Sequence, residues 1–185
     1  LNLCNKNMEN MDTNNNDGKA KHNLLAEVCM AAKYEGESLI TYHDQHQITY
    51  PGYHSQICTE LARSFADIGD IVRGKDLYGG NNKRRQQLEK NLKTIFEKIK
   101  GNNNSTLKGL SIDEVREYWW ALNRKEVWKA ITCKADASSA YFHATCDTGK
   151  GPSVAQKQCR CDKDKGAKDG DQVPTYFDYV PRFLR

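Results

Sequence analysis

ARSFADIGDIVRGKDLYGG, residues 62–80, decides the fold together with SIDEVREYWWALNRKEVWKAITC, residues 111–133. Apolar side chains recur every three or four residues in the first block, which predicts a helix from about Thr59 to Val72. Gly74 follows as a helix stop, because glycine readily adopts the left-handed backbone found just past a helix end. Both blocks contain more Arg, Trp and Cys than simple helix packing requires, so they carry information beyond the helix pattern.

Apolar spacing predicts further helices at residues 24–34, 86–100 and 111–131. Gly101 is a predicted stop for the middle helix, and Ser111 with Glu114 forms a capping-box pattern that opens the last. The predicted loops are residues 5–21, 35–56 and 134–172. Few segments alternate with period two, so the expected class is mainly α, a disulfide-bonded helical bundle with long loops.

Length and composition restrict the class of protein. A chain of 185 residues is long enough to bury one domain core, and 28% charged against 38% hydrophobic residues is typical of a soluble globular segment. The longest apolar run is far shorter than the roughly 20 residues that a membrane-spanning helix needs. The first residues, LNLCNKNMEN, lack the pattern of a secretory signal, so we expect export information to lie outside this chain or to be absent.

Cysteine usage predicts the compartment. The seven cysteines are Cys4, Cys29, Cys58, Cys133, Cys146, Cys159 and Cys161. This number is high for a cytosolic domain and no CxxC pair occurs, which favours disulfides in an oxidising, extracellular setting. An odd count leaves at least one thiol without an internal partner, so we expect its partner in sequence beyond these ends. The aromatic and apolar final residues, VPTYFDYVPRFLR, point the same way.

Two groups of residues are compared with metal sites. One is His43, His46, His54 and Cys58, and the other is Cys146, Cys159 and Cys161. The first spacing matches no common zinc module. Two cysteines separated by one residue point opposite ways in extended backbone and usually split between two bridges. We therefore expect loop histidines, disulfide cysteines, and neither a metal nor another cofactor.

No catalytic signature is present in the sequence. It lacks the G-x-S-x-G elbow, the P-loop, G-x-G-x-x-G and H-E-x-x-H. Carboxylate pairs such as Asp67 with Asp70 are explained by the polar face of a helix, and Asp113 with Glu114 by favourable charge at a helix start. We expect a protein that is not an enzyme and, because no nucleic-acid motif is found and disulfides are expected, one that does not bind nucleic acid.

Two features are candidates for ligand contact. The stronger is a basic segment with Lys83, Arg84, Arg85, Lys90, Lys93, Lys98 and Lys100 against only Glu89 and Glu97. As a helix it presents a cationic face that suits sulfated or sialylated glycans, and the alternative is an ordinary solvated face. The weaker feature is the set of Trp119, Trp120 and Trp128, which the helix pattern assigns mainly to the core, with ligand stacking as the alternative.

Several blocks together resemble a known family. They are ARSFADIGDIVRGKDLYGG, LSIDEVREYWWALNRKEVWKAITC, CRC, VPTYFDYVPRFLR and, upstream, AKHNLLAEVCMAAKYEGESL. In this order they resemble the Duffy-binding-like domains of the erythrocyte membrane protein 1 adhesins of Plasmodium falciparum, and most of all the alpha class. The resemblance covers nearly the whole chain.

The resemblance implies a Duffy-binding-like fold of which this chain is a fragment. Residues 1–57 would belong to the first, loop-rich subdomain with one helix, and residues 58–185 to the second, helical subdomain. The family's cysteines in the QIC and AITC blocks match Cys58 and Cys133, so the resemblance implies a disulfide between them.

The resemblance also implies a function in malaria virulence. Such domains are non-enzymatic cell-adhesion modules of a variant membrane antigen on the outer face of the infected erythrocyte, where they serve cytoadherence and antigenic variation. Implied partners are host erythrocyte or endothelial receptors, antibodies and neighbouring domains of the same adhesin. Alpha-class domains are linked with rosetting through heparan-sulfate-like glycans, complement receptor 1 or blood-group sugars, although four cysteines from Cys133 to Cys161 resemble the commoner subtype rather than the rosetting one. The alternative is a structural, antigenically variable scaffold without a strong ligand of its own.

Overall fold

The computed structural model describes residues 4–13, 18–50, 56–76, 83–102, 107–141, 143–147, 151–161 and 173–185. Within these ranges the helices are α1 (Lys6–Glu9), α2 (Ala20–Thr49), α3 (Ile57–Arg73), α4 (Lys83–Asn102) and α5 (Ile112–Ile131). The short strands β1 (Cys146–Asp147) and β2 (Pro152–Ser153) pair antiparallel, and the 3-10 turns η2 (Phe177–Tyr179) and η3 (Arg182–Leu184) follow. The mainly α class predicted from the sequence is confirmed.

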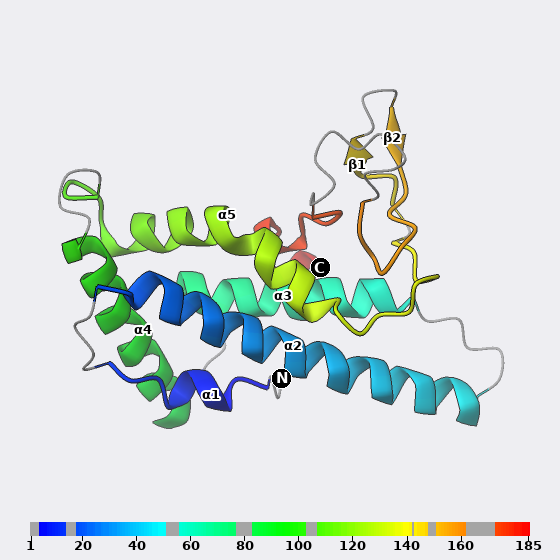
Figure 1. Cartoon of the computed structure of the whole chain (residues 1–185), viewed down its shortest axis with the longest axis horizontal. Coiled ribbons are helices and arrows are strands. Elements are labelled where there is room, and N and C mark those ends of the chain that lie inside the picture. The colour runs from blue at the N-terminus through cyan, green and yellow to red at the C-terminus, as the bar shows by residue number, and fades with distance from the viewer. Residues whose placement is uncertain are drawn as a thin grey trace.

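The helices form a bundle in which α3 packs against both α2 and α5 (Figure 1). α4 lies across the end of the bundle where α5 begins, and the small β1–β2 hairpin stands at the opposite end. The C-terminal turn η2 packs on α3, so the end of the chain returns to the middle of the bundle. Among the described residues, no helix combines the length and the apolar character needed to cross a membrane.

Aromatic rings fill the centre of the bundle. Phe65 of α3 lies between two tryptophans of α5, with ring centroids 5.2 Å from both Trp120 and Trp128. Trp119 meets Phe96 of α4 edge-on at 6.0 Å. All three tryptophans are at most 5% exposed, so the predicted core role of the tryptophans is confirmed.

α2 is much longer than predicted, because residues 35–49, expected as loop, continue the helix. Gly36 indicates a helix break when the sequence is considered alone. In the structure, a Cβ at position 36 would collide with the carbonyl oxygen of Ile131. This glycine therefore lets α2 and α5 approach closely, and it does not interrupt the helix. Gly69 acts in the same way, since a Cβ there would lie 2.7 Å from the ring of Trp120.

The helix ends test three further predictions. Gly74 ends α3 with φ +73°, as expected of a left-handed stop. Ser111 opens α5 with a complete capping box, in which its hydroxyl accepts from the Glu114 amide at 3.2 Å and its amide donates to the Glu114 carboxylate at 2.7 Å. The prediction for Gly101 is wrong, because α4 includes this residue without a positive φ and ends at Asn102.

The disulfide pairing differs from the one that the resemblance implies. Cys58 pairs with Cys159, 101 residues away, and Cys146 pairs with Cys161, while Cys133 is a free thiol. The CRC pair thus splits between two bridges, as its spacing predicts. Cys159 reaches α3 because its loop folds back over α5, where the Trp128 indole donates to the Cys159 carbonyl at 3.1 Å. A closed loop of this length stabilises the fold by about 4–5 kcal/mol in the chain-entropy model.

The disulfides also bear on the two candidate metal sites. Their cysteines, Cys58, Cys146, Cys159 and Cys161, are all bridged and so have no thiolate to offer a metal. His43 and His46 lie on α2, and His54 is outside the described residues. Across the part of the chain that the structure describes, no three His, Cys, Asp or Glu residues are grouped as metal ligands. The division of the chain near residue 57 stays a prediction, although α2 shares one core with α3 and α5.

A buried carboxylate holds the C-terminal segment on the bundle. Asp178, in η2 and 1% exposed, accepts two hydrogen bonds at 2.7 Å from Arg124 and one at 2.9 Å from the Trp120 indole. Arg73, at the end of α3, donates to the Asp178 carbonyl and to the Asp70 carboxylate. α3, α5 and the C-terminal segment therefore meet in one hydrogen-bonded ion cluster.

Replacing Asp178 with Ala should strongly destabilise the fold. The change leaves Arg124 and the Trp120 indole without their carboxylate, and removing one partner of a buried ion pair costs about 3–5 kcal/mol. Thermal unfolding followed by circular dichroism should show a midpoint lower by about 10 °C for a chain of this size. Glu97→Ala at an exposed position of α4 is the control and should stay within about 0.5 kcal/mol. An equally small change in the free energy of unfolding for Asp178→Ala would show that the ion cluster does not hold the fold together.

Mass mapping without reduction should find the two bridges of the structure. Trypsin cleaves after Arg160 and so separates the peptide with Cys159 from the one with Cys161. We expect the Cys159 peptide linked to that of Cys58, and the Cys161 peptide linked to that of Cys146. Cys133 should be alkylated before reduction. A peptide joining Cys58 to Cys133 would instead support the pairing implied by the resemblance.

The Cys29 thiol should react slowly in the folded protein. Burial, with a smaller contribution from Glu126, raises its pKa to about 11. At pH 8 only about 0.1% is then thiolate, against roughly a quarter for an ordinary cysteine with a pKa of about 8.5. Iodoacetamide should therefore modify Cys29 about 200-fold more slowly in the native state than in guanidinium, and the native rate should keep rising with pH up to about 11. Equal rates of Cys29 modification in the native protein and in guanidinium at pH 8 would contradict the buried environment of this thiol.

Candidate functional site

The predicted basic segment forms helix α4, with its apolar and cationic sides separated as expected. The buried side carries Leu88, Leu92, Ile95, Phe96 and Ile99 and packs into the core. The exposed basic residues of the helix are Lys83, Arg84, Lys90 and Lys93. A cationic face is therefore present on the surface, and it lies over the first half of the helix.

The other three predicted cations are engaged in contacts that hold the fold. Lys98 donates to the backbone carbonyl of Thr13, and Lys100 donates to that of Leu110 at 2.6 Å. Arg85 forms an ion pair with Asp76 at 3.1 Å. These cations anchor neighbouring segments, so the seven predicted residues do not act as one uniform surface.

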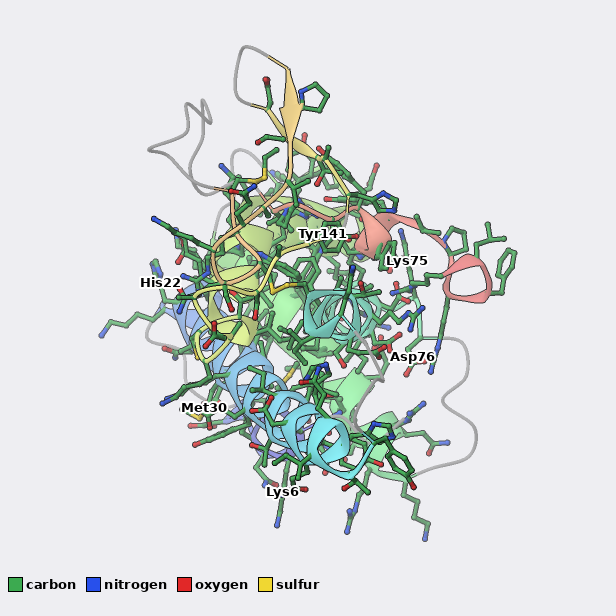
Figure 2. All side chains as sticks on the ribbon, turned by 90° about the vertical axis from the view of Figure 1, so that its right-hand side faces the viewer. Lys6, His22, Met30, Lys75, Asp76 and Tyr141 are labelled. Carbon is green, nitrogen blue, oxygen red and sulfur yellow. A yellow bond between two sulfur atoms is a disulfide. The ribbon has the colours of Figure 1, made fainter. Side chains whose placement is uncertain are left out.

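A groove of about 550 Å³ runs beside the first half of α4. Arg85, Gln86, Leu88, Glu89, Lys90 and Lys93 of α4 line it, together with Asn5, with Ile71 of α3, and with Gly74 and Asp76, which follow α3. The volume is within the range of about 300–1,000 Å³ that is typical of ligand sites. Figure 2 labels Asp76 on the side of the molecule where the C-terminal turns lie.

The acids of the groove are bound by arginines. Asp76 pairs with Arg85 and, at 3.4 Å, with Arg182 of the C-terminal segment. Glu89 accepts two hydrogen bonds from the Arg116 guanidinium, at 2.5 and 2.9 Å. Because these carboxylates are neutralised by their partners, they weaken the positive potential of the groove only a little.

Lys90 and Lys93 are the cations of the groove that remain available for a ligand. Both are exposed, and among the residues that the structure describes neither takes part in an ion pair. They lie one helical turn apart, so both ammonium groups can face one anionic ligand. The arrangement can bind anions.

Arg116 makes the wall of the groove rigid. Its side chain, only 3% exposed, donates to the carbonyls of Val72 at 2.7 Å and Ile71 at 3.1 Å, and these carbonyls lie in the last turn of α3. With its bonds to Glu89, this one side chain ties α3, α4 and α5 together. Gly74 leaves the space for it, since a Cβ there would lie 2.9 Å from the guanidinium carbon.

Sequence reasoning found the basic helix and missed the opposite wall of the groove. Ile71 follows the helix pattern of α3 and Asp76 lies just beyond the helix stop, and neither carries a local signal that relates it to α4. The only indication was the apolar stripe of α4, which requires a partner but does not say which one. Tertiary packing alone brings residue 71 beside residue 88.

Comparison with known proteins identifies the family to which the chain belongs. The family model described as Duffy binding domain matches residues 1–185. The Duffy receptor beta form of Plasmodium knowlesi is 28% identical over 134 residues, which cover 69% of this chain and 10% of the relative. The gamma form is 27% identical over 94 residues, covering 51% and 8%. The chain therefore spans about a tenth or less of the length of these relatives.

A solved structure supports the same family. The ICAM-1-binding DBLbeta domain of PfEMP1 IT4var13 superposes with a TM-score of 0.69 at 28% identity, over 98% of this chain and 39% of that one. The fold and the whole-length family match agree, while the assignment to the alpha class stays a prediction. The chain therefore belongs to the Duffy binding domain family and is a Duffy-binding-like domain of the erythrocyte membrane protein 1 kind.

Proposed function

We propose that this chain is an adhesion module that binds an anionic surface of a host receptor through the exposed half of α4. The single observation that carries the proposal is the pair Lys90 and Lys93 at the rim of a groove whose own acids are already bound by arginines. Unbalanced positive charge on a rigid surface favours and steers an anionic partner. The relatives support an adhesive role, because they are named as Duffy receptors and the solved domain is named as binding ICAM-1.

The proposal extends to the setting in which the module acts. As part of a variant antigen it would face outward from the infected erythrocyte membrane and contact host erythrocytes or endothelium without catalysis. Sulfated glycans of the heparan-sulfate kind or sialylated glycoproteins supply the anionic groups. Rosetting through complement receptor 1 or blood-group sugars would be a special case of this adhesion.

Retention on heparin tests the use of this surface. Lys90→Glu with Lys93→Glu should weaken binding about tenfold, because two surface cations become anions and each contact is worth up to about 1 kcal/mol. The measurement is the salt concentration of elution, with affinity by titration at physiological ionic strength. Lys98 and Lys100 are left unchanged because their side chains hold backbone segments.

The matched control is Lys21→Glu with Lys33→Glu. Both lysines are exposed on α2, so the control changes the net charge equally while leaving α4 intact. We expect the control to keep most of the retention. Equal loss in the two variants would show that net charge decides binding, and no loss in either would leave the scaffold role as the better explanation.

A further inference from the structure

We propose that the groove beside α4 binds an acidic peptide segment and buries one aliphatic or aromatic side chain of that segment on its floor. The inference rests on the proposed function, because it names the class of ligand that the same surface takes. Two features of the groove lead to it: an apolar floor and two cations at the rim.

The floor is formed by Ile71 of α3 and Leu88 of α4, the two aliphatic residues among those that line the groove. Gly74 lines the groove without a side chain, and its φ of +73° disfavours any residue that has one. A groove of about 550 Å³ has room for a large apolar side chain. Burial of a leucine-sized side chain there should strengthen binding by roughly tenfold or more.

The rim selects negative charge next to that apolar side chain. Lys90 and Lys93 lie along the groove, while Glu89 is bound by Arg116 and so does not compete strongly for them. A carboxylate of the ligand can approach either ammonium group without first breaking an ion pair within the described part of the chain. Acidic residues on both sides of one apolar residue match this pattern of charge.

The groove is already formed before a ligand arrives. Arg116 joins the end of α3 to α4, and Arg85 with Asp76 closes the neighbouring edge. A preformed site loses little conformational entropy on binding, so the ordering cost falls mainly on the ligand. A sulfated glycan would engage the lysines but has no apolar side chain for the floor, so a peptide fits the whole groove better.

Two labelled octapeptides test the inference by fluorescence anisotropy. One carries two leucines between three acidic residues on each side, and the other carries two serines in place of the leucines. The protein should bind the leucine peptide about tenfold more tightly than the serine peptide at physiological ionic strength. Equal affinities would overturn the insertion of an apolar side chain.

A groove-filling variant locates the binding. Gln86→Trp places a large side chain in the groove without changing charge, and it should abolish the preference for leucine while heparin retention stays intact. The control is Gln47→Trp, an equal substitution in a separate hollow of about 540 Å³ beside His43 and Asp136, which should change nothing. If Gln86→Trp lowers the unfolding midpoint, Asn5→Trp fills the groove from the opposite wall and gives the same test.

The outcomes separate this inference from the proposed function. If the leucine preference survives both groove-filling substitutions, the groove is not the peptide-binding site. This result overturns the inference, whatever the outcome of the heparin retention test. If Lys90→Glu with Lys93→Glu leaves heparin retention unchanged, the proposed role of this cationic surface is wrong. A leucine preference that the groove-filling variants abolish would then still place a peptide there, held by its apolar side chain alone.

Discussion

The buried carboxylate of Asp178 is the contact on which the arrangement of the bundle depends. It receives hydrogen bonds from Arg124 and Trp120 of α5, while Arg73 of α3 donates to its backbone carbonyl. A buried charge is tolerated only when it is paired and fully hydrogen-bonded. The cluster therefore sets the position of the C-terminal segment relative to α3 and α5, and it adjoins the aromatic core, because the Arg124 guanidinium lies 5.7 Å over the Phe65 ring.

The pairing of buried charges also explains the acidic residues in the block of residues 62–80. Asp67 and Asp70 were assigned to an ordinary polar helix face, yet the structure shows their side chains only 12% and 11% exposed, against Arg182 and Arg185 of the C-terminal segment. Burial raises the pKa of both carboxyls, and these arginines act against that rise. The blocks that resemble the family are therefore partners of one another: the acids of one and the arginines of another meet across the bundle.

α4 shows how far a helical pattern predicts a site. Its apolar stripe and its cationic face follow from the spacing of Leu88, Leu92 and the lysines, and both are present in the structure. The pattern could not separate Lys98 and Lys100, which hold backbone carbonyls, from Lys90 and Lys93, which face the groove. That separation depends on which segment lies beside each turn of the helix, and helical spacing contains no such information.

The helical class, most helix boundaries, the core role of the tryptophans and the family could all be predicted from the chain, because they depend on local spacing and on long blocks of residues. The packing of the helices was needed to show that Gly36 continues α2, that Cys58 pairs with Cys159, and that Ile71 and Asp76 complete the groove of α4. Each of these outcomes depends on contacts between residues far apart in the chain. Such contacts are set by how the helices pack, and a local pattern fits several packings equally well.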